Sequence, residues 1–206
     1  PTKNLLTHLT DRFLFQKRAP VKEILRRLSE RIITILDLHQ VAETILDTFE
    51  ESLRAETGSI FLRNGEGYTL LRSYGISLKK EIKEIEAGDP LLACLIKDRH
   101  PVNLEDELTA SKLPVTVSQW MERLKAVLAV PLFLQGGLIG LLTLGKKKSD
   151  QEYTPEEIDY FPTVAGQVAI ALSNARLYQE SIEARKKIEE MQLELIHREK
   201  MAFVAD

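Results

Sequence analysis

The chain has 206 residues, of which 44% are apolar and 29% charged, enough for one domain with extensions. Lysine and arginine total 28 against 31 aspartates and glutamates, a net charge of -3. The sequence therefore lacks the positive charge on which non-specific nucleic-acid binding depends. No uncharged apolar run reaches the roughly 18 residues of a membrane-spanning helix. The single cysteine, Cys94, excludes an internal disulfide and a multi-cysteine zinc site, and it predicts a reducing, cytoplasmic setting.

Apolar residues near the N-terminus recur in alternating steps of four and three, which is a heptad pattern. The positions are Val21, Leu25, Leu28, Ile32, Ile35, His39, Ala42, Leu46, Phe49 and Leu53. The pattern fits either one long helix that pairs along the whole stripe or two helices with a bend at Leu36–Leu38, where Asp37 caps the second. The bend is favoured. From about His39 onward we expect the helix to lie on its own domain's sheet.

Two hairpins are predicted in the middle of the chain. Residues 59–63 and 68–74 flank Asn64-Gly65, which is typical of a tight turn with positive backbone angles. Residues 127–134 and 138–144 flank Gln135-Gly136-Gly137. The second pair of strands is almost entirely apolar, so we expect these strands to be central and covered on both faces.

Shorter elements are predicted between the hairpins. Asp89 followed by Pro90 is typical of a helix N-terminus, and the helix should run to Lys97. Residues 101–104 fit a short edge strand, and residues 118–124 fit a helix.

A long C-terminal helix begins at Thr154-Pro155. Thr154 can cap it, and Glu157 completes a capping box. No stop signal follows before Phe203, so the helix would be about 73 Å long and much of it must project from a compact core. Pro162 should kink its first turns. In the projecting half a second heptad seam is expected, formed by Ser181, Ala184, Ile188, Met191, Leu195, Arg198 and Ala202.

These elements predict an α+β fold, with an antiparallel sheet of five or six strands, helices on both faces, and long helices at both termini. The chain starts at Pro1 and stops at Asp206 within a helical pattern, so we expect it to be a piece of a longer polypeptide.

Several motifs in the second half resemble the GAF domain family. They are VPL at 130–132, GLIGLLTLG at 137–145, YTPEE at 153–157 and AGQVAIALSNARLY at 165–178. The resemblance runs from Ile35 to Tyr178, and Pro162 departs from the family's usually unbroken helix. The flanks resemble bacterial sensor histidine kinases: 13–18 with 28–33 looks like the segment that follows a membrane-bound sensor, and 199–205 looks like the lead-in to a kinase dimerisation helix.

The resemblance implies three parts: a linker and signalling helix at 1–35, a GAF domain at 36–178, and a coiled-coil linker at 179–206 towards a kinase module of the same polypeptide. It implies a non-catalytic sensor or relay in a homodimer, cytoplasmic or tethered to the inner membrane face, with a small-molecule ligand as a further partner. The candidates for the dimer seam are Leu25, Leu28, Ile32, Ser181, Ala184, Ile188, Met191 and Leu195.

The candidates for a ligand pocket are Phe61, Tyr74, Cys94, His100 and Trp120. A prosthetic-group sensor is the alternative function, with His100 as a haem ligand or Cys94 as a bilin attachment; a cyclic-nucleotide sensor is another, although its signature does not fit this chain. Against these stand simpler interpretations: Cys94 as buried filler, His100 as a loop residue, and the aromatic residues as core. No phosphate loop, paired metal ligands or Ser-His-Asp context is present, so the sequence requires no cofactor.

Charge is uneven along the chain. Residues 1–31 hold eight basic and three acidic side chains, an excess of five, which fits either a patch next to anionic lipid or a solvated helix face. Lys146-Lys147-Lys148 is interpreted as a solubilising turn. His39 is interpreted as a satisfied polar residue at the bend, and His197 as a surface residue.

Overall fold

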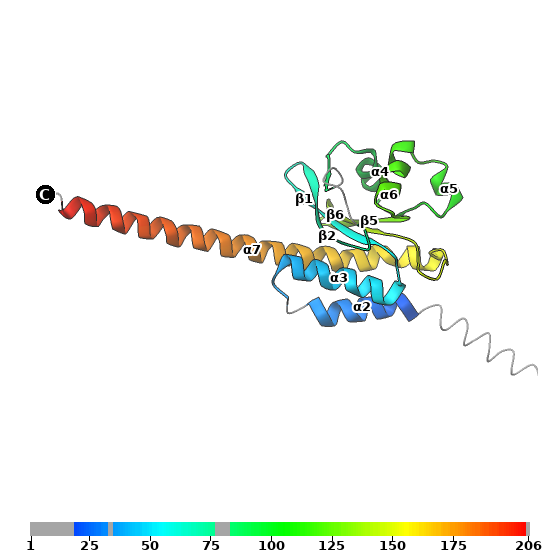
Figure 1. The fold of residues 1–206 in the computed structure, drawn as a ribbon, viewed down its shortest axis with the longest axis horizontal. Coiled ribbons are helices and arrows are strands. Elements are labelled where there is room, and N and C mark those ends of the chain that lie inside the picture. Colours follow the sequence, from blue (N-terminus) through cyan, green and yellow to red (C-terminus); the bar gives the residue numbers. More distant parts are fainter. Residues whose placement is uncertain (1–18, 33–34, 77–82, 205–206) are drawn as a thin grey trace, which may run out of the picture.

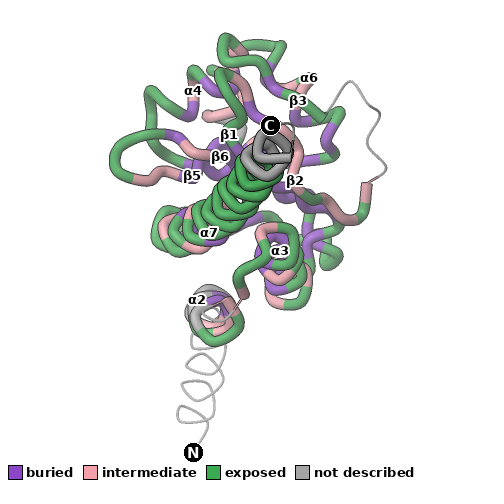
Figure 2. The backbone as a smooth tube through the Cα atoms, turned by 90° about the vertical axis from the view of Figure 1, so that its left-hand side faces the viewer, coloured by how far each residue is buried: buried purple, intermediate pink, exposed green. Residues whose placement is uncertain are grey.

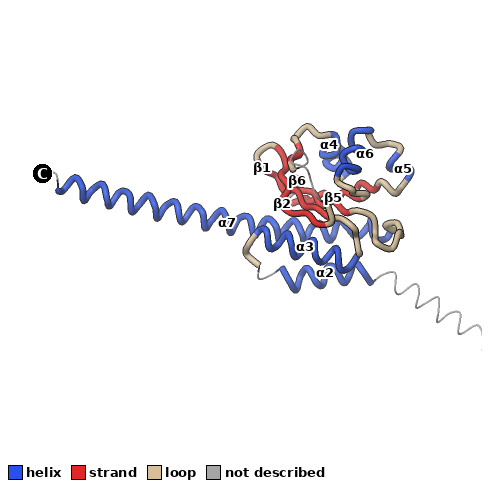
Figure 3. Tube along the Cα trace, viewed as in Figure 1, coloured by secondary structure: helices blue, strands red, loops and turns tan. Residues whose placement is uncertain are grey.

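The computed structural model describes residues 19–32, 35–76 and 83–204. It has a six-stranded antiparallel sheet between two helical layers, and one long helix leaves this body (Figures 1 and 3). The strands are β1 Gly58–Asn64, β2 Gly67–Tyr74, β3 Glu84–Ile85, β4 Val102–Asn103, β5 Leu128–Leu134 and β6 Gly137–Leu144. The helices are α2 Ala19–Ile32, α3 Leu38–Leu53, α4 Pro90–Asp98, α5 Glu107–Ala110, α6 Val115–Arg123 and α7 Pro155–Val204.

The sheet has the order β3-β2-β1-β6-β5-β4, so the two predicted hairpins meet at the central β1–β6 pair. In the second hairpin, Gln135 and Gly136 form the two-residue turn, with φ of 49° and 82°. In the first, Asn64 pairs with Gly67, and only Gly65 has a positive φ, at 60°. The turn is therefore Gly65-Glu66, one residue later than the predicted Asn64-Gly65.

Each face of the sheet carries its own apolar core, because alternate strand residues point to opposite sides. From β1, Ile60 and Leu62 pack with α3 and α7, whereas Phe61 packs with α4 and α6. The central strands β1, β5 and β6 are thus covered on both sides, as predicted for β5 and β6.

The predicted bend near Asp37 is confirmed. Helix α2 ends at Ile32, and the Asp37 carboxylate caps α3 by accepting a hydrogen bond of 2.8 Å from the backbone N–H of Gln40. Helix α3 lies on the sheet, as expected from His39 onward. Helix α2 lies against α3 and α7 (Figures 1 and 2), where Ile24 and Leu28 are buried in the core that those helices share.

Charged side chains of α2 pair with acidic neighbours. Arg26 and Arg27 bind Glu23 at 2.7 and 2.6 Å, and Arg27 also reaches Glu51 of α3 at 2.9 Å. Hydrogen bonds from Arg26 and then Arg27 lower the pKa of Glu23 to about 2. The rest of the predicted basic segment, 1–18, lies outside the described residues.

Helix α7 starts at the predicted capping box: Thr154 N–H donates to the Glu157 carboxylate at 2.8 Å, and Glu157 N–H donates to Thr154 Oγ1 at 3.3 Å. The helix continues through Pro162 without ending. Its first part lies on the sheet, but every residue from Leu177 to His197 is exposed (Figure 2). Among the described residues, no helix has both the length and the apolar character that a membrane span requires.

Candidate functional site

The face of the sheet beneath α4 brings together three of the five predicted pocket residues. Phe61 of β1 and Trp120 of α6 meet edge to face at 5.6 Å between ring centroids, and Cys94 of α4 is half-buried in the same cluster. Leu95 and Met121 belong to the same cluster and are fully buried. In this conformation Phe61 belongs to the core, and Cys94 and Trp120 are partly buried against it.

Tyr74 and His100 lie elsewhere. Tyr74 packs on the opposite face of the sheet, and its hydroxyl donates to the carbonyl of Ala55 at 3.3 Å. His100 is exposed after α4, with Nδ1 at 3.3 Å from the carbonyl oxygen of Pro101. The five predicted residues therefore do not line one pocket.

A buried charged network fixes the start of α7. Lys147 follows β6, and its ammonium group contacts both carboxylate oxygens of Glu157, at 2.6 and 2.9 Å. Both side chains are 9% exposed. The ammonium group also donates to the carbonyl of Glu152 and lies 4.8 Å from the Tyr153 ring centroid. Lys147 is thus not part of a solubilising turn, and that prediction holds only for its exposed neighbours Lys146 and Lys148.

The same network restrains Tyr153. Its hydroxyl donates to the carbonyl of Gly145 at 2.8 Å, and its backbone N–H donates to the Glu105 carboxylate at 3.0 Å. Burial raises the pKa of the Tyr153 phenol well above its ordinary value, with smaller contributions from Tyr74, Glu105 and Glu157. The end of β6 and the first turn of α7 are therefore joined by polar contacts that are shielded from water.

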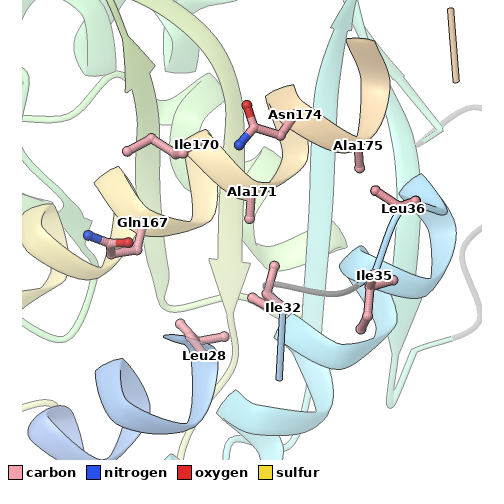
Figure 4. A pocket seen from close by; sticks show the side chains of 9 residues that line it. All are labelled: Leu28, Ile32, Ile35, Leu36, Gln167, Ile170, Ala171, Asn174 and Ala175. Atoms are coloured by element: carbon pink, nitrogen blue, oxygen red, sulfur yellow. The ribbon is translucent and has the colours of Figure 1, made fainter. Parts of the chain in front are cut away.

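An apolar groove lies on the outer side of α7, between α7 and α2 (Figure 4). It has a volume of about 280 Å³ and is lined by Leu28, Ile32, Ile35, Leu36, Gln167, Ile170, Ala171, Asn174 and Ala175. Leu36 and Ile170 are 50% and 45% exposed, so large apolar side chains on both walls of the groove are in contact with solvent. The groove is thus an incompletely covered part of the α2–α7 contact.

The exposed apolar residues of α7 include the predicted C-terminal seam. Ile188, Met191 and Leu195 are about half exposed or more, and Ser181 and Ala184 are exposed as well. The side chains of Arg198 and Ala202, the last two predicted positions, lie outside the described part. The seam continues backward in the same steps of three and four to Leu177, Asn174 and Ile170. The predicted seam starts at Ser181, and the same spacing in the sequence extends it to Ile170.

The predicted seam on α2 has a different environment. Leu28 is 1% exposed and packs in this chain's own core, so it is not available to a second copy in this conformation. Ile32 lines the groove, and the side chain of Leu25 lies outside the described part. At Leu28, the heptad spacing of α2 therefore places an apolar side chain against α3 and α7 of the same chain.

A comparison with family models decides the family. The model of the GAF domain matches residues 35–173, from the α2–α3 connection to the exposed face of α7. The chain belongs to the GAF family. It is a regulatory sensor domain of the kind found in signalling proteins.

Solved GAF domains share its fold at low sequence identity. The GAF domain of an Acinetobacter phosphoenolpyruvate-protein phosphotransferase is 20% identical, with a TM-score of 0.59 over 78% of this chain and 97% of that chain. Residues 122 to 287 of a methyl-accepting chemotaxis protein are 16% identical, with a TM-score of 0.58 over 73% and 97%. The phycoerythrobilin-bound GAF domain of a cyanobacterial phytochrome is 15% identical, with a TM-score of 0.55 over 76% and 96%.

In this GAF domain the described residues include no group of three or more His, Cys, Asp or Glu side chains that could hold a metal ion. Three features of the structure concern α7: its start is anchored by Lys147 and Glu157, a groove lies beside it, and its seam leaves the body. This arrangement is suited to transmitting a change of helix packing over a distance.

Proposed function

We propose that this chain is a non-catalytic relay domain of a two-component histidine kinase, in which two copies pass a signal through paired α7 helices to the kinase module of the same polypeptide. The observation that supports this proposal is the continuous helix from the sheet to Val204, with seam residues that are exposed from Ser181 to Leu195. A single polar helix of this kind is marginal in water, and a partner helix would bury the seam.

The kinase context is supported by the sequence. Residues 199–205, EKMAFVA, resemble the lead-in to a kinase dimerisation helix, and the seam-bearing helix α7 extends into this segment as far as Val204. A ligand or neighbouring domain that favours one packing of α2 against α7 would shift the population of rod arrangements, and so the kinase output. We place the domain on the cytoplasmic side, where the kinase substrate ATP is found.

Dimer formation is tested by charging the seam. In the double variant Ile188→Glu/Leu195→Glu, pairing would bury two unpaired carboxylates per helix, so we expect a monomer where the unchanged chain is a dimer. Sedimentation equilibrium measures the molecular mass. The control is Ile182→Glu/Leu193→Glu, which places the same charges on equally exposed apolar positions outside the seam and should remain dimeric.

A monomeric unchanged chain, or equal loss of the dimer in both double variants, would refute this relay. The kinase context is tested separately, in a polypeptide in which a histidine kinase module directly follows the C-terminal end of this chain. The seam variant should then reduce histidine phosphorylation from ATP, and the control variant should not.

A further inference from the structure

A small cavity, here called the edge cavity, lies where the end of α4 and the first part of α7 both reach β5. Its volume is about 150 Å³, and it shares no lining residue with the α2–α7 groove. Phe133 of β5 packs with the core beneath α4, whereas Ala165 of α7 belongs to the core on the other face. The cavity therefore connects the two helical layers at the edge of the sheet. It is lined by Arg99, Pro101, Pro131, Phe133, Pro162, Ala165 and Gly166.

Two of the lining residues are poor helix formers inside α7. Pro162 cannot donate a backbone hydrogen bond to the carbonyl of Ile158. Gly166 lies one turn later, and its small size is not required by packing, because a Cβ added there would clash with no neighbouring atom. Alanine would favour the helix at either position. Residues that work against the local structure are expected at functional sites, and these two line the same cavity.

The charge in the cavity wall comes from the guanidinium of Arg99. It is held from two sides: Nη2 donates to the carbonyl of Gly136 at 2.6 Å, and Cζ lies 4.7 Å from the ring centroid of Phe133. None of the ion pairs within the described part of the chain includes Arg99. A planar guanidinium with free N–H groups binds a carboxylate through two parallel hydrogen bonds. The wall thus combines one site for an anion with an apolar surface.

We propose that the edge cavity binds a short-chain monocarboxylate, with its carboxylate on Arg99 and its hydrocarbon chain against the rings of Phe133 and Pro162. The other lining residues are apolar, so a second charge or several hydroxyl groups on the ligand would lose water without gaining a partner. The volume corresponds to about five water molecules of roughly 30 Å³ each, which suits a ligand of about six non-hydrogen atoms, such as butyrate.

Such a ligand would contact α7 at the two positions where the helix is least stable. An occupied cavity favours whichever packing of Pro162 and Gly166 against Arg99 binds the carboxylate better, and it would give the relay proposed above an input. Binding itself does not rest on the relay, because one chain supplies every residue of the cavity.

The test is a titration of the isotope-labelled full chain with butyrate at constant ionic strength, followed by NMR. The backbone amide signals of Phe133 and Gly166 should shift and reach saturation. Acetate should bind roughly tenfold more weakly than butyrate, because it removes two fewer CH₂ groups from water. Butylamine has a similar length and the opposite charge, so it should cause no shift at either amide.

Two variants and their matched controls locate the site. Arg99→Gln should weaken butyrate binding by about tenfold or more, because the charged hydrogen bonds are lost. Its control is Arg54→Gln, since Arg54 is also exposed and also follows a helix with a positive φ, 54° against 51°. Gly166→Leu places a side chain in the cavity and should abolish binding. Its control, Gln167→Leu, changes the next residue, which lines the groove instead; both controls should bind as the unchanged chain does.

The outcomes separate this site from the relay. Saturable shifts at both amides that disappear in Arg99→Gln and in Gly166→Leu would support the site. Equal affinity for butylamine, butyrate binding that neither variant weakens, or no saturable shift in the unchanged chain would each refute it. A monomeric chain that binds butyrate would refute the relay and leave the site standing.

Discussion

Lys147 is the residue on which the attachment of α7 depends most directly. Its ammonium group is the cation beside the buried Glu157 carboxylate, and Glu157 also caps the helix. Lys147→Met keeps most of the volume but leaves a buried anion unpaired, so we expect a loss of about 3 to 5 kcal/mol in the free energy of unfolding. Urea denaturation measures it.

The neighbouring lysine provides the control. Lys148 pairs with Glu50 at 2.9 Å, but the two side chains are 44% and 41% exposed. Lys148→Met should therefore cost less than about 1 kcal/mol. Similar losses in both variants would show that the burial of the Lys147 pair has no special role.

Because the phenol of Tyr153 is buried, we expect the stability of the folded chain to decrease in alkali. Because its pKa is raised in the folded state, the folded chain holds this proton more tightly than the unfolded chain does. Its contribution to stability is complete below pH 10, the ordinary pKa of tyrosine, and decreases as the pH rises towards the folded pKa. Stability measured by denaturation should fall above about pH 10.

Tyr153→Phe is the comparison for this prediction. It removes the ionisable group together with the hydrogen bond to Gly145, so the variant should be less stable near neutrality and its stability should fall less steeply in alkali. An identical alkaline slope in the two proteins would contradict the assignment.

Residues with local partners were predictable from sequence, and those with distant partners were not. The caps at Asp37, Asp89 and Thr154 were predicted correctly, because each acts on backbone groups within three residues. Lys147 was misassigned because its burial depends on how a strand end meets a helix start. Tyr74 was grouped with Phe61 because the sequence does not show on which face of the sheet Tyr74 lies.

At the scale of elements, α7 contains a residue that destabilises the helix in which it lies. Pro162 cannot donate to the carbonyl of Ile158, and its ring crowds that carbonyl. Pro162 is exposed, so Pro162→Ala should raise the free energy of unfolding by up to about 3 kcal/mol. The adjacent exposed position gives the control Thr163→Ala, for which a change below about 1 kcal/mol is expected. A destabilised Pro162→Ala protein would indicate that the proline packs favourably here.

The order and type of the main elements were predictable, because the hairpins and α7 have strong local patterns. The heptad spacing before Leu53 was ambiguous, because a pairing helix and a helix packed in its own body bury the same stripe. For Leu28 the structure shows packing within its own body. Helix α5 and strand β3 were not predicted, since segments of four and two residues have no periodicity to detect.

At the scale of the whole molecule, the body and the projecting helix are separable. Every residue from Leu177 to His197 is exposed, so the projecting part adds nothing to the core. A chain that ends at Gln179 should keep the unfolding temperature that the full chain has at high dilution, but lose its rise with protein concentration. Differential scanning calorimetry over a range of concentrations measures both. A lower unfolding temperature for the shortened chain at high dilution would contradict this separation.

The unsupported length of α7 also works as a lever. From Tyr178 to Val204 the helix extends about 40 Å beyond its last buried contact, Ala175. A tilt of about 8° at that point would displace the far end sideways by roughly 5 to 6 Å, about half the diameter of a helix. A small repacking at the groove is therefore enough to move the end of α7 from one side of a packing position to the other.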